Sequence, residues 1–223
     1  MRIFQHILCA LTLAGAALAT AAAPTDPQNG VQYRTLSSAQ NTDSGKKIEV
    51  IEFFAYYCPH CHVFEPVLAA WVKQQGANIV FKRVHVPRDE NVLPQQRLYY
   101  TLEAMGLLDR LHSKVFRAMH VEHARLNRDE AVFDFIEKQG VERNKFIETY
   151  RSFGIQAKVR RAAALMDAYQ VDHWPMIAID GRFLTSPSQA SQASGALQTE
   201  AEQQQSALQV MDFLVAKAKA EQR

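Results

Sequence analysis

The sequence predicts a mixed α/β protein whose sheet is interrupted by an all-helical segment. Residues 47–86 carry a strand pattern, a helix pattern and a second strand pattern in that order. Residues 93–169 are almost entirely helical in pattern, and residues 176–185 return to strand patterns before a last helix. Strand patterns that alternate with a helix indicate a β-α-β unit. We therefore expect the order β-α-β, helical insertion, β-β-α.

The first 21 residues have the parts of a secretory signal peptide. Arg2 precedes an apolar run from Ile7 to Leu18, and small residues follow through Ala23. Ala17-Leu18-Ala19 and Ala19-Thr20-Ala21 are candidate cleavage sites. The apolar run is too short for a comfortable membrane span. We therefore expect a secreted protein whose mature chain begins with an extended, polar and turn-rich stretch over residues 22–45.

Charge and cysteine content narrow the function further. The formal charge at pH 7 is +2, and it falls to +1 without Arg2. Such a balance indicates neither nucleic acid nor an anionic membrane as a partner. Cys9 lies in the signal peptide, so the mature chain keeps only Cys58 and Cys61. Both belong to one Cys-x-x-Cys motif, which leaves no second pair for a structural disulfide.

This motif lies between the first strand and the first helix. Lys47–Tyr57 is rich in β-branched and aromatic residues, as in a strand buried on both faces. Pro59 suits the first position of a helix, which we expect to run to Gln75, and Asn78–Val86 reads as the second strand. Cys58 then lies where backbone N–H groups and the helix dipole stabilise an anion. A lowered thiol pKa favours the nucleophilic thiolate and makes the sulfur a better leaving group, so the motif predicts disulfide exchange.

The motif has two other possible interpretations besides disulfide exchange. With His60 and His62 alongside, the cysteines form half of a possible zinc site, but structural zinc sites need four ligands. His120 and His123 are the other spaced histidine pair, and we interpret them as solvated residues on a helix surface. An inert structural disulfide is the second alternative, but so short a loop restricts the unfolded chain very little.

The middle of the chain predicts a compact helical insertion with helix stops at Gly106, Gly140 and Gly154. Asn127, followed three residues later by Glu130, predicts a capping box that opens one helix. Within this insertion, one stripe of apolar side chains at helical spacing predicts a helix face that packs into the core, and one run of basic residues predicts a helix face exposed to solvent. The stripe consists of Leu107, Leu111, Val115 and Met119, and the basic run of Lys158, Arg160 and Arg161.

The C-terminal part predicts a β-hairpin and one helix. Met176–Ile179 and Phe183–Thr185 flank Asp180-Gly181, a dipeptide suited to a two-residue turn with positive φ angles. A linker rich in Ser, Gln and Ala begins at Ser186, and a helix begins at about Thr199. Its apolar face carries Leu208, Met211, Leu214 and Val215.

Glu52-Phe53-Phe54 followed by Cys58-Pro59-His60-Cys61, behind a secretory signal, resembles the DsbA family of thiol:disulfide interchange proteins from the bacterial periplasm. The Pro59-His60 dipeptide is the most specific part, because it differs between oxidants and reductants of the thioredoxin superfamily. The resemblance is strongest over residues 47–86 and 174–184. It implies a thioredoxin-like fold with an inserted all-helical domain: residues 46–90 and 170–223 form the thioredoxin-like part, and residues 91–169 the insertion.

The resemblance implies a periplasmic enzyme that donates its Cys58–Cys61 disulfide. A substrate thiolate attacks Cys58 to give a mixed disulfide and free Cys61, and a second substrate thiol then releases the oxidised substrate. His60 can give the Cys58 thiolate a hydrogen bond or a positive charge, the alternative being an exposed loop histidine. The redox-active disulfide needs no other cofactor.

Three further residues acquire expected roles through the resemblance. Glu52 lies inside an apolar strand, where a carboxylate is costly to bury unless it is paired or protonated. The resemblance implies a buried acid near Cys61, and the alternative is an edge-strand glutamate that faces water. Pro175 reads as trans from base rates, whereas the resemblance implies a cis-proline loop against the sulfurs. Trp174 departs from the family, which carries smaller residues such as Val or Thr there, so we expect an altered substrate-binding surface.

The expected partners are reduced, unfolded secreted proteins and a quinone-linked membrane protein resembling DsbB that reoxidises the enzyme. We expect a monomer that binds no nucleic acid and no metal. Two alternatives stay open. One is a disulfide isomerase or reductant of the same superfamily, although the dimerising domain of an isomerase is missing before Lys47. The other is a metal-binding module that uses Cys58-Pro59-His60-Cys61-His62.

Overall fold

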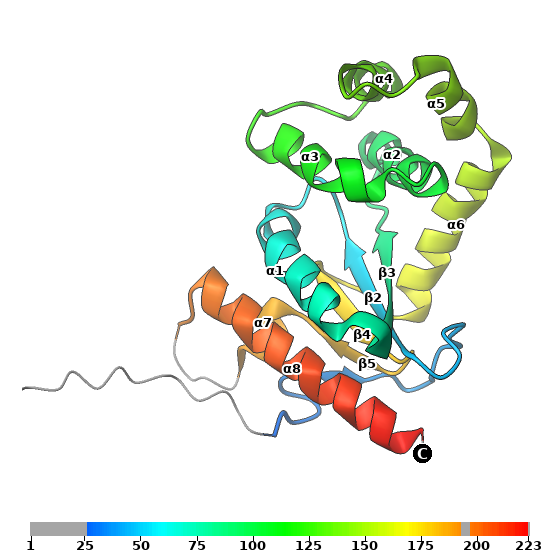
Figure 1. Cartoon of the computed structure of the whole chain (residues 1–223). Helices are drawn as coiled ribbons and strands as arrows, with labels where there is room; N and C mark the ends of the chain where they lie inside the picture. Colours follow the sequence, from blue (N-terminus) through cyan, green and yellow to red (C-terminus); the bar gives the residue numbers. More distant parts are fainter. Residues whose placement is uncertain (1–25, 193–196, 223) are drawn as a thin grey trace, which may run out of the picture.

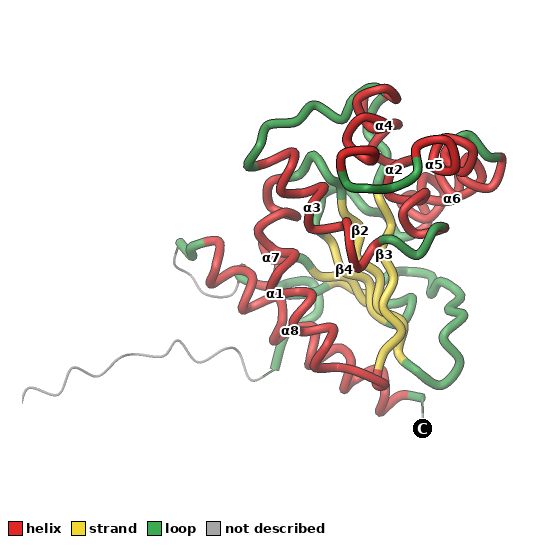
Figure 2. Tube along the Cα trace, turned by 45° about the horizontal axis from the view of Figure 1, so that its top comes forward, coloured by secondary structure: helices red, strands yellow, loops and turns green. Residues whose placement is uncertain are grey.

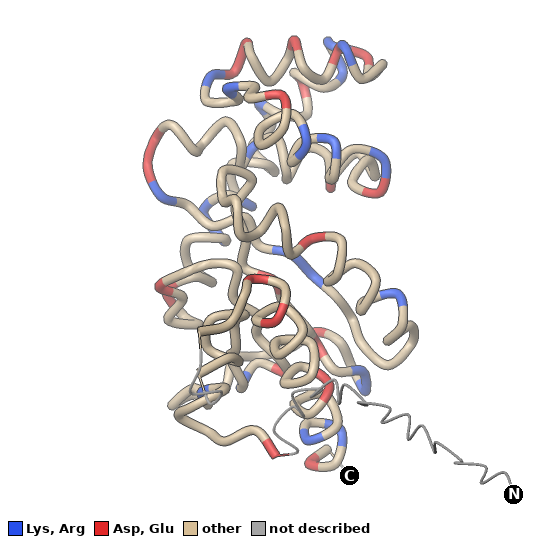
Figure 3. The backbone as a smooth tube through the Cα atoms, turned by 90° about the vertical axis from the view of Figure 1, so that its left-hand side faces the viewer, with Lys and Arg blue, Asp and Glu red and all other residues tan. Residues whose placement is uncertain are grey.

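The computed structural model describes residues 26–192 and 197–222. The predicted signal peptide and Cys9 lie outside these residues. In this part of the chain, no helix combines the length and the apolar character needed to cross a membrane. Figure 3 shows acidic and basic residues interspersed along the helices and loops.

Five strands form one sheet in the order β1-β5-β4-β2-β3 (Figure 1). β2 (Ile48–Phe54) pairs parallel with β3 (Ile79–His85) and antiparallel with β4 (Met176–Ile179), and every residue of β2 is buried. Its β-branched and aromatic side chains suit a strand covered on both faces. β2 ends before the predicted Tyr57 because residues 55–57 form the turn that leads into the first helix. The sheet therefore delivers the cysteine motif from its central strand.

β5 (Phe183–Thr185) and β1 (Arg34–Thr35) complete the sheet, and both pairings are antiparallel. The predicted turn between β4 and β5 is confirmed, since Asp180 and Gly181 have φ angles of 54° and 66°. β1 was not predicted, and it lies inside the stretch that was expected to be merely extended. Two residues are too few to show an alternating pattern, so this strand depends on its partner in the sheet.

One face of the sheet is covered by α1 (Pro59–Gln75) and α8 (Glu200–Glu221), as Figures 1 and 2 show. The predicted bounds of α1 are confirmed. Trp71 Nε1 of α1 donates a hydrogen bond to Asp212 Oδ1 of α8 at 2.8 Å, so the two helices are joined as well as packed. A 3-10 turn (Gly76–Asn78) follows α1, and a short helix that sequence analysis missed, α7 (Pro187–Ala190), lies in the predicted linker. The predicted apolar face of α8 packs into the core through Met211, Leu214 and Val215.

The helical insertion lies between β3 and β4. After a 3-10 turn (Glu90–Val92), it consists of α2 (Leu93–Ala104), α3 (Leu108–His120), α4 (Asp129–Lys138), α5 (Arg143–Tyr150) and α6 (Phe153–Ala168). Figure 1 shows α2 to α5 beyond one end of the sheet, while α6 returns alongside it. The predicted stripe on α3 is confirmed at its centre, where Leu111 and Val115 are fully buried, and the basic run on α6 is exposed.

Within the helical insertion, two predicted helix boundaries are confirmed and two are wrong. Gly106 and Gly140 follow α2 and α4 with φ angles of 66° and 73°, as expected of helix-terminating glycines. Gly154 does not stop a helix. It lies in the first turn of α6, which begins where the Ser152 side chain accepts the Ile155 N–H. The other wrong boundary is the capping box at Asn127: α4 begins after Arg128 without a side-chain cap, and Glu130 instead pairs with Arg143 of α5 at 3.0 Å.

Candidate active site

Cys58 is the N-cap residue of α1. Its backbone is extended (φ −83°, ψ 117°), and Pro59 occupies the first helical position. The Cys61 N–H donates to Cys58 Sγ at 3.3 Å. The unpaired N–H groups and the dipole of a helix N-terminus stabilise negative charge. The predicted position of Cys58 at the helix start is confirmed.

The two thiols are free in this structure, and they differ in acidity. A hydrogen bond from the Cys61 thiol is the main reason that the pKa of Cys58 is lowered to about 7, against the opposing effect of burial. Backbone N–H groups of Cys61 and His60 and the charge of His60 lower this pKa further. Burial, followed by the neighbouring Cys58, raises the pKa of Cys61 well above its ordinary value. Near neutral pH, the pair therefore carries its negative charge on Cys58 and its proton on Cys61.

The loop before β4 lies against Cys58. The Trp174–Pro175 peptide bond is cis, as the resemblance implied, and the Trp174 carbonyl oxygen lies 3.6 Å from Cys58 Sγ. The indole of Trp174 is half-buried and meets the Tyr57 ring edge-on, with centroids 6.1 Å apart. The backbone of this loop thus contacts the thiol, while the tryptophan ring lies at the rim of the site.

A cavity of about 290 Å³ opens beside these residues. It lies between the start of α1, the cis-proline loop, and the starts of α7 and α8. The residues that line it are His60, His173, Trp174, Pro175, Pro187, Ser188, Glu200, Gln203 and Gln204. The structure therefore brings three of the predicted site residues, His60, Trp174 and Pro175, to one cavity next to Cys58.

Glu52 is buried in the centre of the sheet, at 1% exposure. The alternative of an edge-strand glutamate facing water is wrong, because β2 lies between β4 and β3. Arg83 Nε donates to Glu52 Oε2 at 2.8 Å, while Glu52 Oε1 is buried without a hydrogen-bond partner. Burial raises the pKa of Glu52 to about 7, although the Arg83 charge opposes the shift. The negative charge of Glu52 is also one cause of the raised pKa of Cys61.

Known proteins resemble this chain in sequence and in fold. The model of the DSBA-like thioredoxin domain matches residues 49–205. The thiol:disulfide interchange protein DsbA of Burkholderia cepacia is 37% identical over 206 residues, which covers 92% of both chains. DsbA of Bordetella parapertussis is 40% identical over 184 residues, 82% of this chain and 87% of the relative. The crystal structure of Pseudomonas aeruginosa DsbA superposes with a TM-score of 0.77 at 33% identity, covering 86% of this chain and 94% of that one.

The chain belongs to the DsbA family. It is a DsbA-type thiol:disulfide oxidoreductase with a thioredoxin-like fold and a helical insertion between strands. This family uses a redox-active cysteine pair and needs no cofactor.

Behind the cysteines of this DsbA-family protein lies a charged network that sequence analysis missed. Arg83 Nη2 donates to both carboxylate oxygens of Glu65, at 3.0 and 2.9 Å. His112 Nε2 of α3 lies 3.4 Å from Glu65, and His112 Nδ1 lies 2.9 Å from the Tyr56 hydroxyl. Burial lowers the pKa of His112. The pKa of Glu65 is lowered against the effect of burial, first by the hydrogen bond and charge of His112 and then by the charge of Arg83. One signal was present in the sequence, since Glu65 follows Cys61 by four residues and so shares its helix face.

His120 is not the solvated surface residue that sequence analysis expected. Its Nε2 donates to the Tyr56 carbonyl oxygen at 2.8 Å, and its ring stacks on His62, with centroids 4.9 Å apart and planes 7° apart. His123 lies beyond the end of α3 and is exposed, as expected. Over the described ranges, no group of three or more His, Cys, Asp or Glu residues is arranged to hold a metal ion.

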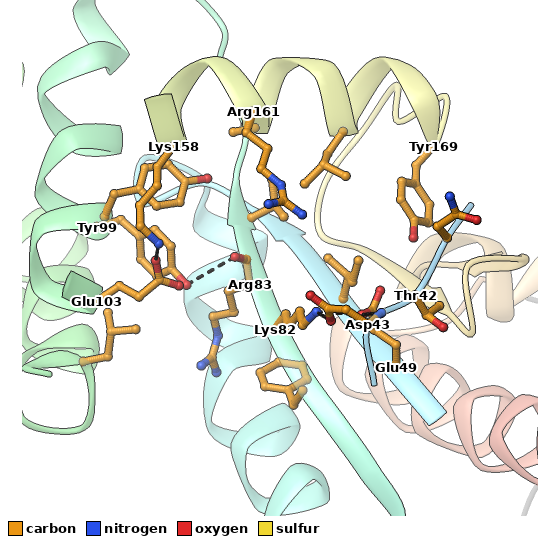
Figure 4. Close-up of a pocket in the computed structure, with 18 residues that line it drawn as sticks. Thr42, Asp43, Glu49, Lys82, Arg83, Tyr99, Glu103, Lys158, Arg161 and Tyr169 are labelled. Carbon is orange, nitrogen blue, oxygen red and sulfur yellow. Dashed lines mark hydrogen bonds and ion pairs between the residues drawn. The ribbon is translucent and has the colours of Figure 1, made fainter. Parts of the chain in front are cut away.

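A larger cavity, of about 570 Å³, lies on the sheet face that α6 covers (Figure 4). Figure 4 shows Lys158 and Glu103 together at one end and Lys82 near Glu49 at the other. Both pairs have N···O distances of 2.7 Å. Neither cysteine lines this cavity. This cavity is therefore not the place of thiol exchange, although it is larger than the cavity beside Cys58.

Proposed function

We propose that this protein oxidises pairs of thiols in newly secreted, unfolded proteins by donating its Cys58–Cys61 disulfide. A substrate thiolate attacks Cys58 Sγ, and the Cys58–Cys61 bond breaks with its electron pair passing to Cys61. A second substrate thiolate attacks the substrate sulfur of the mixed disulfide and expels Cys58 as a thiolate. The substrate loses two electrons and two protons, and the enzyme ends reduced.

The observation that carries this proposal is the unequal acidity of the two thiols. The pKa of Cys58 is lowered to about 7, whereas that of Cys61 is raised. A cysteine with a low pKa is the better leaving group, so the mixed disulfide at Cys58 is readily resolved by the second substrate thiol. A stabilised thiolate also favours the reduced enzyme, which makes the disulfide form more oxidising than one formed by two unperturbed cysteines.

Each remaining site residue has a proposed role. Pro59 starts the helix that stabilises the Cys58 thiolate, and His60 adds positive charge beside it. Glu52, with a pKa of about 7, can accept or return the proton of Cys61 near neutral pH. Pro175 and Trp174 border the small cavity beside Cys58, and this cavity is the proposed binding place for substrate side chains.

We propose a periplasmic location after removal of residues 1–21, and reoxidation by a quinone-linked membrane protein resembling DsbB. The membership of the DsbA family supports both. The enzyme is proposed to act as a monomer, with residues 91–169 as an inserted domain between the two thioredoxin-like parts. The acidic and basic residues interspersed along the chain in Figure 3 fit partners that are varied unfolded chains rather than one polyanion.

The test of the thiol roles uses the mature protein and a reduced, unfolded polypeptide. We expect Cys58→Ser to abolish oxidation of the polypeptide, because no electrophilic sulfur is left for attack. In Cys61→Ala, Cys58 is first converted to a mixed disulfide with an aromatic thiol, which supplies the oxidised sulfur, and a reduced polypeptide with a single cysteine then displaces that thiol from Cys58. The resulting adduct should accumulate, because neither Cys61 nor a second substrate thiol is present to release it. Peptide mapping of the adduct identifies the sulfur, and capture at Cys61 in the converse Cys58→Ala variant alone would contradict the assignment.

A separate test addresses the reoxidising partner. Membranes that contain the DsbB-like protein should reoxidise the reduced enzyme in the presence of quinone, and membranes from a strain lacking that protein should not. Thiol content, measured with a thiol-specific dye over time, follows the reaction. Equal recycling by both membrane preparations would exclude this partner.

A further inference from the structure

We propose that Glu200 is a positioning residue of this site, holding the His60 imidazolium beside the Cys58 thiolate. This inference rests on the proposed function, because it assigns a partner to the histidine that acts on Cys58. It concerns a residue outside the Cys-x-x-Cys motif, 140 positions further along the chain.

The contact is direct, and both ends of it are fixed by helix starts. His60 Nδ1 lies 2.7 Å from Glu200 Oε1. Glu200 is the first residue of α8, whose start is held by a capping box: Thr199 Oγ1 accepts the Glu202 N–H, and the Glu202 carboxylate accepts the Thr199 N–H. A carboxylate at this position is also favoured by the helix dipole. The bond between Trp71 and Asp212 fixes α8 against α1 further along.

Glu200 differs from the other charged groups near Cys58 in its position at the small cavity. Among the described residues that line the small cavity, it is the only carboxylate. Apart from His60, the remaining titratable residue of that lining is His173. Its Nδ1 lies 2.6 Å from Asp172 Oδ1, and its Nε2 lies 3.0 Å from Ser186 Oγ. Both histidines of the lining therefore have a carboxylate partner, but Asp172 lies outside the lining, and only the pair with Glu200 includes the histidine of the motif.

The physical effect follows from the charges. The hydrogen bond with Glu200 is the first cause that raises the pKa of His60, and the Cys58 thiolate contributes in the same direction. A histidine that keeps its proton near neutral pH stabilises the thiolate through its positive charge. The stabilisation is present only in the reduced enzyme, because the disulfide carries no thiolate. Glu200 thus makes the enzyme a stronger oxidant by acting through His60.

The expected effect is modest because both side chains are accessible, at 70% exposure for His60 and 46% for Glu200. Exposed ion pairs are screened by solvent and typically change an equilibrium by about two- to five-fold. We therefore expect Glu200→Gln to shift the equilibrium constant of the enzyme with glutathione by about this factor toward the disulfide form. The thiolate of Cys58 should titrate at correspondingly higher pH.

The experiment compares Glu200→Gln, His60→Ala and the double variant with the unaltered mature protein. Asp172→Asn is the matched control, since it removes a carboxylate from the other His–carboxylate pair at the cavity. Two quantities are measured: the equilibrium constant with glutathione at pH 7, and the ultraviolet absorbance of the thiolate against pH. Glu200→Asp keeps the charge but shortens the side chain, so it should behave like Glu200→Gln if the hydrogen bond is required.

The result expected is a shift in Glu200→Gln that disappears in the His60→Ala background and at pH 5, where Cys58 is protonated and no thiolate is left to stabilise. The inference is overturned if the shift survives in the double variant, or if Asp172→Asn gives the same shift. It is also overturned if His60→Ala changes neither measurement, and that outcome would remove His60 from the proposed function as well. If His60→Ala raises the thiolate pKa and Glu200→Gln does nothing, only the role of Glu200 fails.

Discussion

Glu52 is a carboxyl group buried on the central strand, where one oxygen binds Arg83 and the other has no hydrogen-bond partner. Such a group is costly to ionise, and its pKa of about 7 in the folded protein compares with an ordinary value of 4.5. A raised folded pKa contributes stability that is complete below the unfolded pKa and is lost as pH rises through the folded one. The buried Glu52 carboxyl group therefore lowers the free energy of unfolding increasingly between about pH 5 and pH 8.

We expect Glu52→Gln to remove this pH dependence. The free energy of unfolding of the unaltered protein, relative to the variant, should fall by roughly 2 kcal/mol between pH 5 and pH 8. Urea denaturation of the oxidised forms measures it, since the disulfide removes the titration of the two thiols from the comparison. Parallel stability curves for the two proteins would show that Glu52 does not titrate in this range.

Trp174 lies half-buried at the rim of the small cavity, with its backbone against Cys58 and its ring against Tyr57. A large aromatic ring there offers contact area to a bound peptide and also narrows access to the sulfur. We expect Trp174→Val to change the rate of mixed-disulfide formation with peptides more than the rate with glutathione, because a small thiol barely samples the cavity.

The comparison for Trp174→Val needs two rate constants and a denaturation midpoint. A ring packed wholly in the core would cost roughly 3 kcal/mol or more on truncation, so we expect a smaller loss for this half-buried one. Equal rate changes for peptides and glutathione, together with a loss of the larger size, would contradict the role of Trp174 in substrate binding.

Among the elements, the β4–β5 hairpin depends on a glycine. Gly181 has a φ angle of 66°, and a Cβ built there would lie 2.2 Å from the Gln40 carbonyl oxygen. The two residues are also joined by a hydrogen bond, because the Gln40 N–H donates to the Gly181 carbonyl oxygen at 2.8 Å. This bond connects the N-terminal segment to the turn. The turn and the N-terminal segment therefore constrain each other.

We expect Gly181→Ala to lower the free energy of unfolding by at least about 2 kcal/mol, because positive φ strain and the clash with backbone add. Gly140→Ala is the matched control: its φ angle is 73°, but a Cβ there meets nothing within 4 Å. The control should lose about 1 kcal/mol, from the backbone strain alone. Urea denaturation of both variants measures the difference. Equal losses of unfolding free energy would show that the Gln40 backbone can move away from the new methyl group without lowering stability.

The elements that sequence analysis predicted well carry their signal locally. The start of α1 at Pro59 and the Asp180-Gly181 turn depend on residues within a few positions, and both are confirmed. The elements it missed depend on distant partners: β1 is two residues paired with β5, and α7 is one helical turn begun by Ser186. At the site, Arg83 reaches Glu52 only through the parallel register of β2 and β3, and Glu200 reaches His60 only through the packing of α8 beside α1. No local pattern reports either contact.

At the scale of the whole molecule, the redox state of one cysteine pair should change the stability of the fold. A thiolate held at pKa about 7 in the folded protein ionises at about 8.5 in an unfolded chain. A depressed folded pKa contributes stability that is present above the unfolded value and is lost as pH falls through the folded one. This contribution belongs to the reduced protein only. Cys61 opposes it only above about pH 8.5, because its own pKa is raised in the folded state.

The reduced protein should therefore become more stable relative to the oxidised protein as pH rises from 6 to 8, by about 1 kcal/mol. Paired urea denaturation curves, with and without a reductant, measure the difference at each pH. The double variant Cys58→Ser, Cys61→Ser is the control, because reductant should leave its curves unchanged. The stability difference between the two redox states could instead be the same at pH 6 and pH 8. In that case the Cys58 thiolate would not stabilise the reduced fold, and the low pKa of Cys58, on which its oxidising power depends, would be contradicted.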